Sequence, residues 1–156
     1  MDILYIEAST LRRWNLDEFA QRVGDTAHII ESRYVYDFDK TAELDRILAS
    51  RERAPDAIII QECSAFFPGD LVAYRNLYRD WIRRVKDTNA LPVIATTVPP
   101  AAGRTLRDHV KEFLKLKLLG RADGYEQIVQ FNQWLRELSV TERVPLFDVE
   151  RVTRKS

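Results

Sequence analysis

Cysteine and histidine are scarce in this sequence. Among its 156 residues there is one cysteine, Cys63, and there are two histidines, His28 and His109. A single thiol can form neither a disulfide framework nor a multi-cysteine zinc site, and two histidines are too few for a histidine-rich metal centre. We therefore expect a protein without a resident metal or other cofactor.

Long apolar runs and a net charge are missing as well. No apolar run approaches the roughly 20 residues that span a membrane. Residues 1–3 are not a basic region leading into an apolar stretch, so we expect no signal peptide and a cytoplasmic protein. Lys plus Arg and Asp plus Glu both number 24, which gives a formal net charge of zero. Overall charge therefore gives no reason to expect nucleic acid or an anionic membrane as the partner.

The composition that remains is typical of a globular protein. Hydrophobic residues make up 46% and charged residues 31%, and the length predicts one domain over residues 1–156. Short apolar runs alternate with amphipathic segments. The predicted strands are residues 3–6, 27–30, 57–60, 92–97 and 144–149. The predicted helices are residues 15–23, 70–85, 105–119 and 125–140, and a further helix that is capped by Asp39 or Thr41 and ends before Pro55.

Strand and helix alternate five times, which is typical of a parallel sheet with helices on both faces. The unbroken β-branched run over 57–60 supports this, because a strand covered on both faces has no polar side. The predicted fold is a three-layer α/β/α sandwich around a five-stranded parallel sheet, in the flavodoxin-like strand order 2-1-3-4-5. Ligands of such sheets bind beyond the carboxyl ends of the strands.

That rule selects the candidate functional residues without any motif. They are the polar and small residues that follow the predicted strands: Glu7, Ala8, Ser9, Thr10, Gln61, Glu62, Cys63, Ser64, Thr96, Thr97, Asp148, Glu150 and Arg151. Cys63 has no histidine beside it in the sequence, which favours a small buried apolar side chain over a reactive thiol.

Two doubly wound families resemble parts of this layout. Residues 55–60 and 91–96 are similar to the third and fourth strands of receiver domains. Gln61 and Glu62, however, stand where a receiver has its acceptor aspartate, and the path from 97 to 144 is long for that family. Within this alternative, Glu7, Glu62 and Asp148 are three strand-end carboxylates that could bind Mg²⁺ through their oxygens. Ion pairing of these acids, with Arg12, Arg104 or Arg151, is the other interpretation.

The second resemblance is to the SGNH (GDSL-type) hydrolase superfamily, over about the last two-thirds of the chain. It rests on PDAIII, on LPVIATTVPP, and on FNQWLRELSVTERVPLFDVE, in which Asn132 opens the closing pattern. The first strand fits too, because IEAST stands where that family has its Gly-Asp-Ser block. The resemblance implies Ser9 as nucleophile, Asp148 as the acid that orients a base, and Ser64 with backbone near Ser9 as oxyanion donors.

The sequence departs from this family at three blocks. Glu7 and Ala8 replace Gly-Asp, residues 62–65 read ECSA in place of Gly-x-Asn-Asp, and Arg151 stands where the family has its catalytic histidine. A working triad would then need His109, or a residue of another chain, as its base.

Three functions remain open. The first is a divergent ester or acyl hydrolase that uses Ser9, Asp148 and His109, with Ser64, Glu62, Cys63, Glu7 and Arg151 lining the cleft. The second is a pseudoenzyme, a non-catalytic module that binds a small acyl ester or a protein partner on the same scaffold. The third is the receiver-like or Mg²⁺-binding domain.

Two further segments suggest surfaces for binding. Arginines outnumber lysines 18 to 6, and a group of them on the third helix could bind phosphate: Arg75, Arg79, Arg83 and Arg84. Aspartates on the same helix favour a solvated, salt-bridged face instead. The apolar and basic helix predicted over 105–119 could form the interface of a homo-oligomer.

Overall fold

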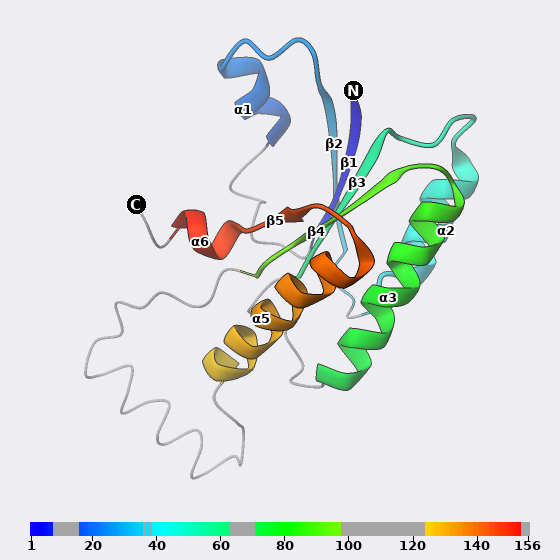
Figure 1. The fold of residues 1–156 in the computed structure, drawn as a ribbon. Coiled ribbons are helices and arrows are strands. Elements are labelled where there is room, and N and C mark those ends of the chain that lie inside the picture. Colours follow the sequence, from blue (N-terminus) through cyan, green and yellow to red (C-terminus); the bar gives the residue numbers. More distant parts are fainter. Residues whose placement is uncertain (8–15, 36, 38, 63–70, 98–123, 154–156) are drawn as a thin grey trace.

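The computed structural model describes residues 1–7, 16–35, 37, 39–62, 71–97 and 124–153. Its elements, in chain order, are β1 (Asp2–Glu7), α1 (Leu16–Arg22), β2 (Ile29–Tyr34), α2 (Thr41–Ser50), β3 (Ala57–Gln61), α3 (Leu71–Asp87), β4 (Leu91–Ala95), α5 (Gly124–Glu142), β5 (Leu146–Phe147) and α6 (Val149–Thr153). Figure 1 shows the strands at the centre with helices on either side. The predicted helix over 105–119 lies outside the described residues.

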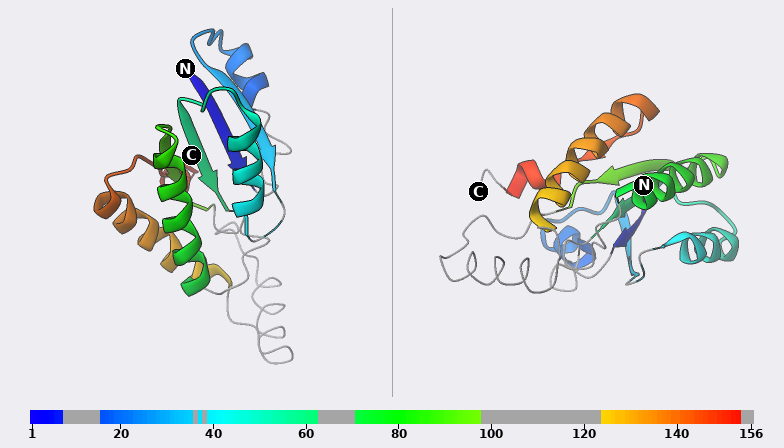
Figure 2. Two further views of the ribbon diagram at one scale, coloured as in Figure 1. Left: turned by 90° about the vertical axis from the view of Figure 1, so that its right-hand side faces the viewer. Right: turned by 90° about the horizontal axis from the view of Figure 1, so that it is seen from below.

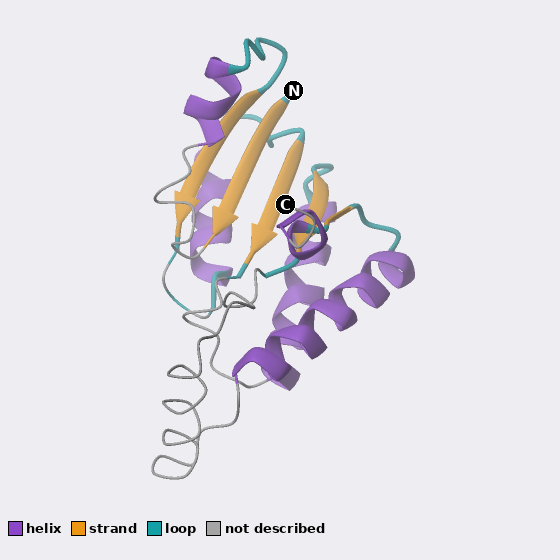
Figure 3. Ribbon diagram, turned by 90° about the vertical axis from the view of Figure 1, so that its left-hand side faces the viewer, coloured by secondary structure: helices purple, strands orange, loops and turns teal. Residues whose placement is uncertain are grey.

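The five strands form one sheet in the order β2-β1-β3-β4-β5, as predicted. Every neighbouring pair is parallel. Figure 3 shows the arrowheads of the strands pointing toward the same edge of the sheet, which we call the carboxyl edge. The architecture is therefore the α/β sandwich that the alternation of strands and helices predicted.

One face of the sheet carries the main apolar core. Leu4, Ile6, Ile58, Ile60 and Ile94 are all 2% exposed or less and belong to one cluster. Helices α2, α3 and α5 supply the other side of that cluster, and Figure 2 shows α2 and α3 covering this face. Aromatic rings make up much of it: those of Tyr74, Tyr78, Trp81, Phe131 and Trp134.

The opposite face of the sheet is more polar near the carboxyl edge. Side chains alternate along a strand, so Tyr5 and Glu7 point away from the face that carries Leu4 and Ile6. Glu7 and Gln61 are partners in the β1–β3 register. The Tyr5 hydroxyl donates to the Gln61 side chain, whose amide donates to the carbonyl of Thr96 at 2.8 Å. Burial raises the pKa of Tyr5, and the charge of Glu7 raises it further.

Gly24 ends α1 as the sequence predicted. Its φ of +71° is a left-handed conformation that glycine adopts without strain. The amide of Asp25, the residue after it, donates to the carbonyl of Ala20 at 2.9 Å, which satisfies an orphan carbonyl at the helix end.

The last strand was predicted too long. The sequence suggested a strand over 144–149, but β5 contains only Leu146 and Phe147 and pairs with two residues of β4. Asp148 accounts for the early carboxyl end of the strand, because its Oδ1 accepts a hydrogen bond from the amide of Arg151 at 3.2 Å. This is the geometry of a helix N-cap, so Asp148 ends the strand and begins α6.

Candidate functional site at the carboxyl edge

Buried polar side chains gather at the carboxyl edge of the sheet. Within the described part of the chain, the buried polar and charged residues are Glu7, Lys40, Gln61, Glu62, Thr96, Thr97, Asn132 and Glu150. Five of them end or directly follow β1, β3 and β4; Lys40 precedes α2, Glu150 lies in α6, and Asn132 reaches them from α5. Burying polar groups is costly unless they are hydrogen-bonded. We therefore take this edge, with the hydrogen bonds of its polar side chains, as the candidate site.

Lys40 and Glu62 form a fully buried ion pair, which we call the Glu62 pair. Both side chains are 1% exposed, and the Lys40 ammonium donates to Glu62 Oε1. The ammonium also donates to the carbonyl of Asp37 at 3.2 Å, and the Tyr74 hydroxyl donates to Glu62 Oε2 at 3.2 Å. The ammonium lies 6.0 Å from the centre of the Trp81 ring. The pair therefore ties the end of β3 to α2 and α3.

Asp148, Arg136 and Glu150 form a second group, which we call the Asp148 network. Arg136 on α5 donates to both carboxylate oxygens of Asp148, each at 2.9 Å, and to Glu150 Oε2 at 2.8 Å. The Thr96 hydroxyl donates to Asp148 Oδ1 at 3.1 Å. Hydrogen bonds from Arg136 hold the pKa of Asp148 below its usual value, and the two carboxylates hold the pKa of Arg136 above its own.

Asn132 and Thr97 connect the two groups. The Asn132 side chain accepts from the amide of Thr97 at 2.8 Å and donates to its carbonyl at 2.7 Å and to Glu150 Oε2 at 3.0 Å. The Thr97 hydroxyl donates to the carbonyl of Glu62 at 3.1 Å. A continuous set of hydrogen bonds therefore runs from β3 across β4 to α5 and α6.

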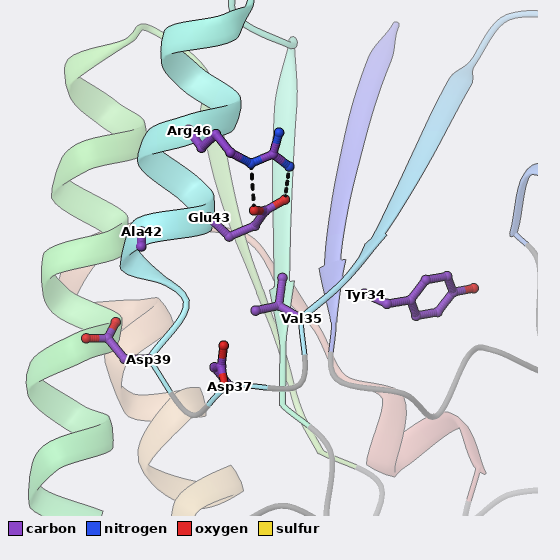
Figure 4. A pocket seen from close by; sticks show the side chains of 7 residues that line it. All are labelled: Tyr34, Val35, Asp37, Asp39, Ala42, Glu43 and Arg46. Carbon is purple, nitrogen blue, oxygen red and sulfur yellow. Dashed lines mark hydrogen bonds and ion pairs between the residues drawn. The ribbon is translucent and has the colours of Figure 1, made fainter.

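A pocket of about 440 Å³ opens at the carboxyl end of β2. Figure 4 shows its lining, which comes from the residues after β2 and from the first turns of α2: Tyr34, Val35, Asp37, Asp39, Ala42, Glu43 and Arg46. Arg46 and Glu43 form an ion pair within it, with a contact of 2.9 Å. Three carboxylates and one guanidinium line this pocket together with the less polar side chains of Tyr34, Val35 and Ala42.

Several predicted site residues lie outside the described residues. These are Ser9, Cys63, Ser64 and His109, so their roles remain predictions. His28 lies just before β2, at the opposite edge of the sheet, where its ring nitrogen contacts Asp25 at 2.8 Å.

The three strand-end carboxylates do not form a metal site. The described residues contain no group of three His, Cys, Asp or Glu side chains that could hold an ion. The β1–β3 register explains this, because Glu7 lies beside Gln61 and Glu62 turns to the other side of the sheet, toward Lys40 and Tyr74. Asp148 is bound by Arg136 instead. The expected ion pairing is therefore present for Glu62 and Asp148, but with Lys40 and Arg136 as partners; Arg151 contributes its backbone amide to Asp148.

Sequence reasoning missed Lys40, Tyr74 and Arg136. Lys40 lies between Asp39 and Thr41 and has the local pattern of a surface lysine. Arg136 left a usable signal, because it follows Asn132 by one helical turn and therefore shares its face of α5.

Comparisons with known proteins support the architecture. No protein-family model matches the chain, and no curated protein matches it. Solved structures do match, and each is similar over 94% of this chain. A GDSL-like lipase from Bacteroides thetaiotaomicron has a TM-score of 0.58 and 14% identity, with 67% of its own chain covered. A protein described as lipolytic and of the G-D-S-L family, from Desulfitobacterium hafniense, has a TM-score of 0.60 and 12% identity, with 76% covered. A protein described as an acylhydrolase, from Bacteroides fragilis, has a TM-score of 0.59 and 16% identity, with 66% covered.

The structure and the comparisons together define the class. The chain is a doubly wound α/β protein with a buried polar carboxyl edge. More narrowly, it has the SGNH hydrolase-like fold, as the sequence resemblance implied. At these identities the likeness extends to the fold alone. None of the described helices is both long enough and apolar enough to cross a membrane.

Proposed function

We propose that this chain is a non-hydrolytic ligand-binding protein built on the scaffold of the GDSL-type hydrolases. The observation that carries the proposal is the state of Asp148, the residue to which the sequence resemblance assigns the role of triad acid. Its carboxylate accepts four hydrogen bonds, from Arg136 Nε, Arg136 Nη2, the Thr96 hydroxyl and the amide of Arg151. Four is about the number that an ionised carboxylate accepts.

A triad needs that carboxylate for another purpose. The acid holds a histidine in the right tautomer and stabilises the imidazolium that forms when the histidine takes the serine proton. In this protein the positive charge beside Asp148 is already present, as the guanidinium of Arg136. A guanidinium cannot act as a base because it stays protonated in proteins. The Asp148 network therefore supports binding and architecture, not proton transfer.

The ligand class that we would test first is a small acyl ester. The similar structures are described as a lipase, a lipolytic protein and an acylhydrolase. Ser9 follows β1 by two residues and so belongs to the segment that leaves the carboxyl edge. In this proposal the Ser9 hydroxyl contacts the ester without attacking it.

A second candidate is a serine ester hydrolase in which Ser9 attacks, Ser64 donates to the oxyanion and His109 is the base. The shared fold and the placement of Ser9 after β1 favour it.

The experiment is hydrolysis of short-chain nitrophenyl esters by the purified chain, with Ser9→Ala and His109→Ala as matched variants. Binding of a non-hydrolysable phosphonate analogue of the same ester is measured in parallel by calorimetry. The binding proposal predicts analogue binding, weakened in Ser9→Ala, with equal background hydrolysis in all three proteins. Turnover that is lost in both variants would establish the hydrolase. Absence of both turnover and binding would remove acyl esters as the ligand class.

A further inference from the structure

Arg75 and Arg79 share one aromatic ring on the surface between α3 and α5. They lie one helical turn apart on α3, and their guanidinium carbons are 5.5 and 5.7 Å from the centre of the Trp134 ring on α5. The indole is buried, with 8% of its surface exposed, whereas Arg79 is exposed and Arg75 is half-buried. The ring therefore holds two cationic groups close together at a partly exposed site.

Neither arginine has a carboxylate partner among the described residues, in contrast to the next two arginines of the same helix. Arg83 pairs with Asp80 at 2.6 Å and Arg84 pairs with Asp45 at 2.8 Å. The Nε atom of Arg75 is buried and has no hydrogen-bond partner in the described part of the chain. The sequence did not separate these two pairs of arginines, but the structure does.

Such an arrangement is costly without an anion. Like charges one helical turn apart repel each other, and a buried N–H donor without a partner loses the hydrogen bond that it had in water. Stacking on an indole offsets part of the cost by a cation–π attraction, but the planar N–H edges of both guanidinium groups gain no hydrogen-bond acceptor from it. Those edges match the spacing of two oxygens on one phosphate or carboxylate group.

We propose that Arg75 and Arg79 form a binding site for a phosphate-bearing ligand, with Trp134 holding the two guanidinium groups in place. A phosphate monoester suits the site better than a single carboxylate, because its double negative charge balances both cations and its oxygens can engage both forks. This site is separate from the carboxyl edge and does not depend on whether the protein binds or hydrolyses an ester there.

The test is the rise in melting temperature with inorganic phosphate, measured against sodium chloride at equal ionic strength. A ligand that binds only the folded state raises the melting temperature by mass action. We expect the rise in the natural chain and in the control Arg83→Gln, which removes an arginine of the same helix that is already paired. In Arg75→Gln/Arg79→Gln we expect phosphate affinity to fall by about tenfold or more. No rise in the natural chain, or an equal rise in the double variant, would overturn the proposal.

A second variant covers the case in which the glutamine pair does not fold. Arg75→Lys/Arg79→Lys keeps both charges and loses the planar forks, so it should bind phosphate more weakly than the natural chain. Equal affinity would overturn the proposal that the guanidinium groups bind the phosphate through their planar N–H edges. Flotation with phosphatidylcholine vesicles, with and without phosphatidic acid, then identifies the source of the phosphate. Binding to phosphatidic acid vesicles that requires both arginines assigns a lipid headgroup. Phosphate binding without vesicle binding assigns a soluble phosphorylated molecule.

Discussion

The two charged groups at the carboxyl edge balance the charge of their carboxylates in different ways. In the Glu62 pair, one ammonium balances one carboxylate and both are 1% exposed. In the Asp148 network, one guanidinium balances two carboxylates, and the side chains of Arg136, Asp148 and Glu150 are 32%, 21% and 5% exposed. The first group is closed to water and the second is partly open to it.

This difference decides how each group responds to change. Removing one member of a buried pair leaves an uncompensated charge in a medium that solvates it poorly, which costs more than the pair itself contributes. In the network, each remaining member keeps other hydrogen-bond partners and some contact with water. Removing one member of the Glu62 pair should therefore lower the free energy of unfolding strongly. Removing one member of the Asp148 network should lower it less.

The largest effect is expected for Lys40→Met. It removes the ammonium from a carboxylate that is 1% exposed, while the Tyr74 hydroxyl still donates to that carboxylate. We expect a loss of about 3–5 kcal/mol in the free energy of unfolding. Urea denaturation measures it. The matched control is Arg46→Met, an arginine on α2 that is 61% exposed and paired with Glu43, for which about 1 kcal/mol or less is expected.

A double variant sharpens this result. Lys40→Met/Glu62→Leu removes both charges, so it should recover much of the stability that Lys40→Met loses. If Lys40→Met lowered the free energy of unfolding no more than the Arg46→Met control does, the contrast between the Glu62 pair and the Asp148 network would not hold.

A smaller loss is expected for Arg136→Gln. Asp148 keeps the Thr96 hydroxyl and the Arg151 amide, and Glu150 keeps the Asn132 amide. Loss of the charged hydrogen bonds at a partly exposed site should cost about 1.5–3 kcal/mol. Urea denaturation of Arg136→Gln beside Arg83→Gln, whose side chain is 63% exposed, separates this loss from the general effect of removing an arginine. A cost equal to that of Lys40→Met would mean that the network is as closed to water as the pair.

The Asp148 network should also respond to acid. Arg136 holds the pKa of Asp148 below its usual value in the folded protein. The carboxylate therefore stabilises the fold above its unfolded-state pKa of about 3.9, and this stabilisation is lost as the pH falls through the lower folded-state pKa. Unfolding free energies measured from about pH 5 downward should fall less steeply in Asp148→Asn, which still caps α6 because asparagine is also an N-cap residue. An unchanged acid slope would show that Asp148 contributes little to it.

The Asp148 network also shows what local sequence patterns can predict and where they stop. Strand order and layers followed from apolar periodicity, because the 57–60 run and the helix spacing are local signals that tertiary packing preserves. Asp148 was placed at the end of the last strand, but its role as a helix cap depends on the contact with Arg151 three residues later, inside a helix of only five residues. Such a short helix has almost no periodic signal.

Partners across the sheet were harder to predict. The sequence placed Glu7 and Glu62 at strand ends, and both are there, but their faces depend on the register between β1 and β3. A shift of one residue moves a side chain to the other face, so spacing along the chain could not show that the two acids diverge. Lys40 lies 22 residues from Glu62, and no local pattern connects them.

The smallest effect is expected for Asp45→Asn, which tests an exposed ion pair between α2 and α3 against the buried Glu62 pair. Asp45 on α2 is 51% exposed and pairs with Arg84 on α3, and Arg84 keeps Asp80 as a partner at 2.5 Å. Water solvates both charges, so we expect a loss of about 0.5 kcal/mol or less, and added salt should reduce it further because screening weakens exposed pairs first. Urea denaturation at low and high salt measures both quantities. A salt-independent loss of more than about 1 kcal/mol would mean that this exposed pair contributes as the buried Glu62 pair does. Burial would then not explain the difference in strength between the two pairs.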